Sequence, residues 1–209
     1  MPRPLLLSSY YPEAGILALA EASHLAGRST RLFLPDPHIP LLAPLSRAPL
    51  VGDRLRRVLD RRQGPHRLER PVTYVASPFE TLRVLSRGIP SAAALTSRLM
   101  YRVRTEFDAR VAALLSTSSE PVTAVTMPGA GYLTQRALPE GSFAVVHMVN
   151  SHPRQHNKLL QRHAGLSNRH HEAVDERTIA RVDLELERAD LILAPTRLVG
   201  EGLAWPSLG

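Results

Sequence analysis

The sequence contains no cysteine among its 209 residues, so disulfides, thiolate nucleophiles and cysteine-ligated metals are excluded. It also contains no apolar run near the roughly 20 residues that a membrane-spanning helix needs. The first apolar run, residues 4–7, is shorter than the core of about 7–15 residues in a secretory signal. These absences predict a cytoplasmic protein.

Lysine and aromatic residues are scarce. Lys158 is the only lysine among 26 basic residues, and aromatic residues make up 5% of the chain. The net charge of +7 alone would suit an anionic partner, but an arginine bias points to gene base composition as much as to phosphate contacts. Few rings are available for stacking bases, so we expect no nucleic-acid partner.

Several catalytic motifs are absent as well. There is no Gly-x-x-x-x-Gly-Lys-[Ser/Thr] loop, no Gly-x-Gly-x-x-Gly after the first predicted strand and no Gly-x-Ser-x-Gly, which disfavours kinases, dinucleotide oxidoreductases and α/β-hydrolases. A zinc motif of the His-Glu-x-x-His type is also missing, so no metal is expected despite a histidine-rich segment. Its histidines are His147, His152, His156, His163, His170 and His171.

Strand and helix signals alternate along the chain. Apolar residues make up 44% and charged residues 22%, which suits one globular domain. No Asn-Gly hairpin signal occurs, and the alternation predicts an α/β fold: a doubly wound, Rossmann-like parallel sheet of about six or seven strands with helices on both faces. The predicted strands are residues 4–7, 31–34, 72–75, 122–126, 143–149 and 191–194.

Two helices between the third and fourth strands have clear signals. Ser77-Pro78-Phe79-Glu80 predicts a capping box with proline at the first helical position. A leucine-rich stripe with a period of four predicts a long amphipathic helix that begins near Ser91. The stripe consists of Leu95, Leu99, Val103, Phe107, Val111 and Leu115.

A basic stretch precedes the third strand. Its arginines are interleaved with apolar residues, so it forms either a solvated helix face or a basic amphipathic helix on an anionic membrane surface, such as the inner face of the cell membrane. The arginines are Arg54, Arg56, Arg57, Arg61, Arg62, Arg67 and Arg70.

Candidate ligand-binding residues follow the predicted strands, because ligands of open α/β sheets bind beyond the carboxyl ends of the strands. Gly15 follows the first strand, and Gly129 follows the fourth within a run of small residues. Ser151, His152 and Arg154 follow the fifth, and His152 could donate to a sugar hydroxyl or a phosphate. Simple turns at the glycines and helix capping by His152 are the alternatives.

The most informative block is residues 185–203, ELERADLILAPTRLVGEGL. A helix face formed by Ile179, Val182, Leu186 and Ala189 leads into it. Residues 191–194 then suit a strand covered on both sides, and Thr196 can cap the next helix. The block resembles the last helix–strand–helix of the N-terminal domain of retaining family 4 glycosyltransferases.

Two other runs resemble the same family. SHPRQHNKLL at residues 151–160 is similar to the "SHPRxQxxLL" run of a glycosyltransferase subgroup. The segment after the first strand is similar to the family's opening "YPPxxGG", although Ala14-Gly15-Ile16 stands where two adjacent glycines are common.

The resemblance implies two doubly wound domains facing a cleft. The first holds a small-molecule or lipid-linked acceptor, and the second holds a nucleotide-diphosphate sugar, with no further cofactor. Residues 1–200 would be the acceptor-side domain and residues 201–209 a truncated interdomain segment. We expect His152 to be catalytic, Gly15, Gly129, Ser151 and Arg154 to bind substrate, and the chain to be inactive without the donor domain or a partner chain. The alternative is a non-catalytic Rossmann-like module that binds a sugar, a lipid or a partner protein.

Overall fold

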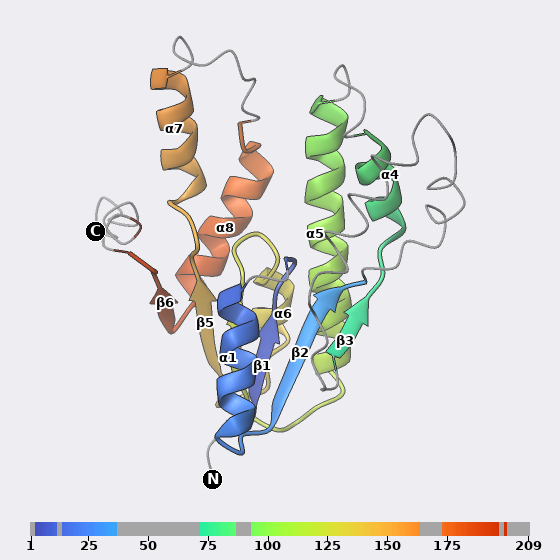
Figure 1. Cartoon of the computed structure of the whole chain (residues 1–209), viewed down its shortest axis with the longest axis vertical. Helices are drawn as coiled ribbons and strands as arrows, with labels where there is room; N and C mark the ends of the chain where they lie inside the picture. Colours follow the sequence, from blue (N-terminus) through green and yellow to red (C-terminus); the bar gives the residue numbers. More distant parts are fainter. Residues whose placement is uncertain are drawn as a thin grey trace.

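The computed structural model describes residues 3–11, 14–36, 72–86, 93–163 and 173–196 together with Val199. These residues form one six-stranded sheet with helices around it (Figure 1). The strands are β1 (Leu5–Ser8), β2 (Thr30–Pro35), β3 (Val72–Val75), β4 (Thr123–Thr126), β5 (Phe143–His147) and β6 (Leu191–Leu193). The helices are α1 (Ala14–Leu25), α4 (Pro78–Ser86), α5 (Ala93–Leu115), α6 (Tyr132–Arg136), α7 (Pro153–His163) and α8 (Glu176–Arg188).

Every strand pairs in parallel with its neighbours, in the order β3-β2-β1-β4-β5-β6. β1 lies in the middle, with Leu5 opposite Thr30 of β2 on one side and Thr123 of β4 on the other. The strand order reverses between β1 and β4, which makes this pair the topological switch point, the usual position of a ligand in such sheets. The predicted parallel α/β sheet is confirmed.

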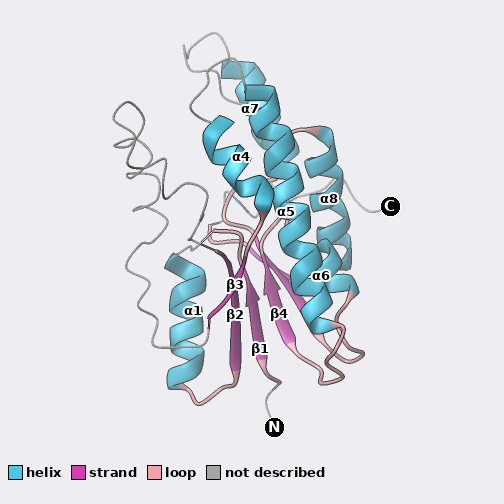
Figure 2. Ribbon diagram, turned by 90° about the vertical axis from the view of Figure 1, so that its right-hand side faces the viewer, coloured by secondary structure: helices cyan, strands magenta, loops and turns pink. Residues whose placement is uncertain are grey.

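Alternate residues of β1 enter two separate cores. Leu6 packs with Val103 and Phe107 of α5 on one face. Leu5 and Leu7 pack with Ile16 and other residues of α1 on the opposite face. Figure 2 shows the same arrangement, with α1 on one side of the sheet and α4, α5, α6 and α8 on the other. Such two-sided burial explains why the strands read as continuous apolar runs.

The predicted burial of residues 191–194 is wrong. Leu191, Ile192 and Leu193 are 44%, 38% and 40% exposed, because β6 is the last strand in the sheet order and pairs with β5 alone among the described strands. β5 also ends at His147, two residues before the predicted end. An apolar run does not by itself distinguish an edge strand from a central one.

The predicted stripe on α5 is wrong only at its first residue. Leu95 is 52% exposed, whereas Leu99, Val103 and the residues that follow in the stripe are buried. The amino-terminal end of α5 rises beyond the strands (Figure 1), so its first turn has no sheet beneath it. Burial therefore follows the extent of the sheet and not that of the helix.

The two predicted caps have different outcomes. Thr196 Oγ1 accepts a hydrogen bond from the Val199 N–H at 3.2 Å, as expected for the turn after β6. At the start of α4, the Ser77 hydroxyl instead donates to Glu106 of α5, and the Glu80 carboxylate accepts from Tyr10 and Arg83. Both members of the predicted capping box therefore bind other side chains.

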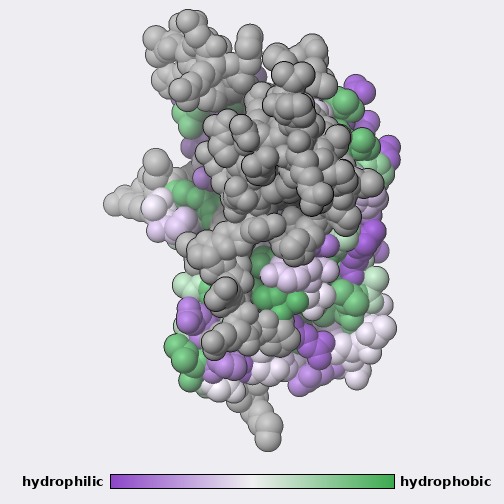
Figure 3. Space-filling model, turned by 45° about the vertical axis from the view of Figure 1, so that its right-hand side comes forward, coloured by the Kyte–Doolittle hydropathy of each residue, from purple (hydrophilic) through white to green (hydrophobic). Residues whose placement is uncertain are grey.

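Figure 3 shows hydrophobic and hydrophilic side chains intermingled over the coloured part of one face. Within the described ranges, no helix is long and apolar enough to cross a membrane. The arginine stretch between Arg54 and Arg70 lies outside the described residues, so the membrane-surface interpretation stays a prediction.

Candidate functional site

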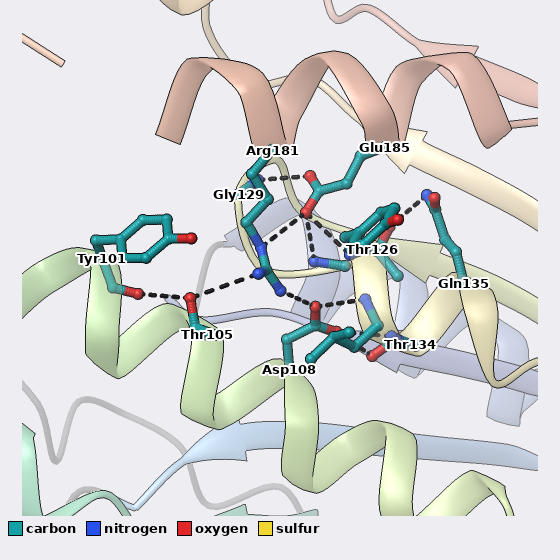
Figure 4. A network of polar contacts seen from close by, with 12 residues as sticks. Tyr101, Thr105, Asp108, Thr126, Gly129, Thr134, Gln135, Arg181 and Glu185 are labelled. Carbon is teal, nitrogen blue, oxygen red and sulfur yellow. Dashed lines mark hydrogen bonds and ion pairs between the residues drawn. The ribbon is translucent and has the colours of Figure 1, made fainter. Parts of the chain in front are cut away.

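The turn between β4 and α6 is held by a buried carboxylate. Gly129 has a φ of +83°, a backbone conformation that favours glycine. Its N–H donates to Glu185 Oε2 at 2.6 Å, and the N–H groups of Gly131 and Tyr132 donate to Glu185 Oε1 at 2.9 Å each. Glu185 reaches the turn from α8 and is completely buried (Figure 4).

A second buried carboxylate binds the first turn of α6. Asp108 of α5 accepts from the Leu133 N–H at 2.7 Å, the Thr134 N–H at 2.8 Å and the Thr134 hydroxyl at 2.6 Å. Arg181 lies between the two acids, since it donates to Asp108 while its Nε lies 3.6 Å from Glu185 Oε1. This network joins α5, α6 and α8 (Figure 4).

The network decides what the β4–α6 turn can do. An unoccupied helix N-terminus attracts anions because its N–H groups lack partners. Here those N–H groups already donate to Glu185 and Asp108, and Gly129 gives its own N–H to Glu185. Burial raises the pKa of Glu185 to about 7, against the lowering effect of the Gly131 and Gly129 N–H bonds. The arrangement favours a structural turn at Gly129.

His152 precedes α7 and caps it. Its Nδ1 accepts from the Arg154 N–H at 3.2 Å, and its Nε2 lies 2.9 Å from Asp183 Oδ1 of α8. The residue is 3% exposed. Burial lowers the pKa of His152 from its ordinary value of 6.5, although Asp183 opposes this shift. A neutral ring with its proton on Nε2 fits both contacts, and this placement favours the capping role over direct contact with substrate.

Arg154 shares the same carboxylate. Its Nη2 lies 2.5 Å from Asp183 Oδ2, and its side chain is 49% exposed. The neighbouring Ser151 is half-buried. His152 and Arg154 are thus brought together through Asp183, with Arg154 on the solvent side.

Gly15 lies beside a residue that the sequence did not single out as a site. A Cβ placed on Gly15 would lie 3.6 Å from Cε1 of His147, the last residue of β5. His147 Nδ1 is a buried atom without a hydrogen-bond partner among the described residues. Burial lowers the pKa of His147, which favours a neutral ring.

All five predicted site residues follow carboxyl ends of strands, but the neighbours of four of them form three groups. A Cβ on Gly15 would lie beside His147, the Gly129 N–H donates to Glu185, and His152 and Arg154 contact Asp183. Sequence reasoning missed Asp108, Arg181, Asp183 and Glu185. The spacing of four between Arg181 and Glu185 on one helix was a usable signal for that pair.

A separate buried cluster stands beside β1. The Tyr10 hydroxyl donates to Glu80 Oε2 at 2.7 Å, and Arg83 forms two hydrogen bonds to the same carboxylate at 2.6 and 2.5 Å. Burial and the neighbouring Glu80 raise the pKa of Tyr10, so the hydroxyl stays protonated. The cluster fixes the ring of Tyr10 at the carboxyl end of β1.

The parallel sheet, its strand order and the polar groups along its carboxyl edge define a Rossmann-like α/β protein. Within the described part of the chain, no group of three or more histidine, aspartate or glutamate residues is arranged to hold a metal ion. Comparison with protein-family models, curated proteins and solved structures found no match.

Proposed function

We propose that this chain is the acceptor-side domain of a two-domain retaining glycosyltransferase. The supporting observation is that the helices of two segments that resemble this family meet in the fold. His152 and Arg154 belong to the SHPRQHNKLL run, and both contact Asp183 on α8, the helix that leads into the second segment. The same helix carries Glu185, the first residue of that second segment.

Each of these residues has a distinct role in the proposal. Arg154 is held by Asp183 but remains half-exposed, so it can also meet a hydroxyl or an anionic group of an acceptor. Ser151 precedes it with a hydroxyl that can donate or accept. His152 is a positioning residue, because its ring fixes the start of α7 and the carboxylate that orients Arg154.

The donor belongs to a second domain in this family. That domain supplies the basic pair that stabilises the leaving diphosphate, on a longer form of this chain or on another protein. Electrostatic stabilisation of this kind contributes several kcal/mol, and about 1.4 kcal/mol corresponds to a tenfold change in rate. The 209-residue protein alone is therefore expected to transfer no sugar at a useful rate.

The test compares two proteins. One is the 209-residue chain, and the other continues with the residues encoded directly downstream. Both are incubated with radiolabelled UDP-glucose, UDP-N-acetylglucosamine and GDP-mannose, and sugar release and the anomeric configuration of products are measured. We expect activity with retention from the longer protein only. Sugar transfer by the 209-residue chain would overturn the two-domain requirement. If neither protein transferred sugar, the transferase proposal would be overturned.

The closed β4–α6 turn favours a second candidate, a non-catalytic binding module. The backbone N–H groups of this turn and of the start of α6 donate to Glu185 and Asp108, so they are not available to bind a phosphate. A module of this kind would bind a sugar, a lipid or a protein without donor turnover. In the same assay it would leave every nucleotide sugar intact in both proteins.

A further inference from the structure

Arg104 of α5 lies at the switch point of the sheet. Its guanidinium carbon lies 6.0 Å from the centre of the Tyr10 ring and 5.9 Å from that of Tyr11, both just after β1. Its Nη1 would lie 3.3 Å from a Cβ placed on Gly129, just after β4. The side chain therefore joins the two loops where the strand order reverses.

Arg104 differs from the other arginines inside the described structure. Three of the others are, like Arg104, buried or half-buried: Arg28, Arg83 and Arg181. Arg28 donates to a carbonyl and a hydroxyl, Arg83 to Glu80, and Arg181 to Asp108. Among the described residues, the Arg104 guanidinium contacts only these aromatic rings and lies near Gly129.

The guanidinium is not fully withdrawn from solvent. Arg104 is half-buried, and none of its nitrogens is among the buried, unpaired polar atoms of the described residues. Two acids bound to the same loops are engaged elsewhere, because Glu80 binds Tyr10 and Arg83, and Glu185 binds backbone amides. A half-buried cation that has no counter-ion in the described part of the chain suits an anionic ligand.

The surroundings hold this cation in place. The Tyr10 hydroxyl is bonded to Glu80, which fixes the ring under Arg104. The two loops are also linked directly, because Ser9 Oγ lies 3.0 Å from Met127 Sδ. The rings contact the guanidinium through cation–π interactions and leave its N–H groups to bind an anion.

We propose that Arg104 binds the phosphate group of a small phosphorylated molecule at the β1–β4 switch point. Its planar N–H fork matches two phosphate oxygens and forms charge-assisted hydrogen bonds with them. The binding site does not depend on sugar transfer. Its assignment to the acceptor, which would then be a phosphorylated compound, rests on the proposed glycosyltransferase function.

The test measures binding to the 209-residue protein by calorimetry, with glucose 6-phosphate, inorganic phosphate, glucose and glucuronate as probes. The variants are Arg104→Gln and the control Arg102→Gln. Arg102 is exposed on the same helix and lies over the Phe79 ring at 5.7 Å, so the control removes the same charge and a similar ring contact. We expect both phosphate probes to bind and Arg104→Gln to weaken them by about tenfold or more, with less than a twofold change in the control.

Arginine modification of the wild-type protein provides a measurement that needs no variant. Phenylglyoxal is added with and without inorganic phosphate, and modified sites are mapped by mass spectrometry. We expect phosphate to protect Arg104 and not Arg102. Absence of phosphate binding, equal weakening in both variants, preference for glucuronate, or equal protection of both arginines would each overturn the proposal, whatever the transfer assay shows.

Discussion

Glu185 of α8 accepts a hydrogen bond at 2.6 Å from the backbone N–H of Gly129, 56 residues earlier in the chain. This contact gives the first residue of the ELERADLILAPTRLVGEGL block a structural role, since the carboxylate of Glu185 accepts hydrogen bonds from the backbone of the β4–α6 turn. A buried acid that accepts three backbone N–H bonds is costly to replace, because the amides would be left without acceptors.

Glu185→Gln should therefore destabilise the protein. A glutamine amide can accept from one side only, and its NH₂ group would face a backbone N–H, so we expect a loss of about 1–3 kcal/mol in the free energy of unfolding. Urea unfolding monitored by circular dichroism measures this loss. Glu187→Gln on the exposed face of the same helix is the control and should stay within about 0.5 kcal/mol. Equal effects of the two changes would contradict the role of Glu185.

Two glycines at the carboxyl edge should respond in opposite ways to alanine. A Cβ on Gly131 would lie 2.5 Å from the Cβ of Thr126, so Gly131→Ala forces the backbone to shift and should cost about 1–3 kcal/mol. A Cβ on Gly15 meets nothing closer than 3.6 Å, and Gly15 lies in the first turn of α1. Gly15→Ala should therefore be neutral or stabilise by up to about 1 kcal/mol.

Thermal and urea unfolding of both alanine variants check this difference. A marked loss of stability in Gly15→Ala would show that the backbone there needs glycine for the fold. If Gly15→Ala keeps its stability but lowers sugar transfer in the longer protein, close approach of a ligand to the backbone of Gly15 is supported.

Most of the fold was predictable because each strand carries its own local signal. Val72–Val75 was predicted to the residue, and apolar runs between turn residues marked the remaining strands to within two residues. The error at Leu191 has a different cause, since the exposure of a strand depends on its neighbours in the sheet. Position in the sheet is a long-range property that a short window of sequence does not contain.

The candidate site was less predictable because its contacts join residues far apart in the chain. His152 was predicted to donate to a sugar hydroxyl or a phosphate, with helix capping as the alternative, but Asp183, 31 residues later, lies 2.9 Å from its Nε2. Gly129 was predicted to bind substrate, with a simple turn as the alternative, and its N–H donates to Glu185. In both cases the predicted residue contacts a carboxylate of α8. No local pattern around the histidine or the glycine indicates that partner.

His152 and Arg154 should have separable effects on transfer in the longer protein. Arg154→Ala leaves the His152–Asp183 contact in place, so it should lower activity without lowering the melting temperature by more than a few degrees. His152→Ala removes a buried ring and should lower both activity and melting temperature. His156 is an exposed residue of α7, and His156→Ala is the control for both measurements. Full activity in Arg154→Ala would remove Arg154 from the proposed acceptor site.

The stability of the protein should also depend on the titration of His152. Burial lowers its folded pKa below the ordinary 6.5, so the unfolded chain takes up a proton before the folded protein does. Its contribution is then fully present above pH 6.5 and is lost as the pH falls through 6.5 toward the folded pKa, with a slope of at most about 1.4 kcal/mol per pH unit. Asp183 and Arg154, which face the ring, shift its pKa in opposite directions.

His152→Asn isolates this effect, since asparagine does not titrate and can still cap α7. Urea unfolding at pH 7.5 and pH 5 should show a larger loss of stability in the wild type than in the variant, because the remaining titrating groups are common to both. An NMR titration of the His152 ring should give a midpoint below 6.5. A His152 midpoint above 6.5 would mean that the attraction of Asp183 outweighs burial. The ring would then be charged near neutral pH and could donate from both nitrogens, which would break the Nδ1 cap on the Arg154 N–H.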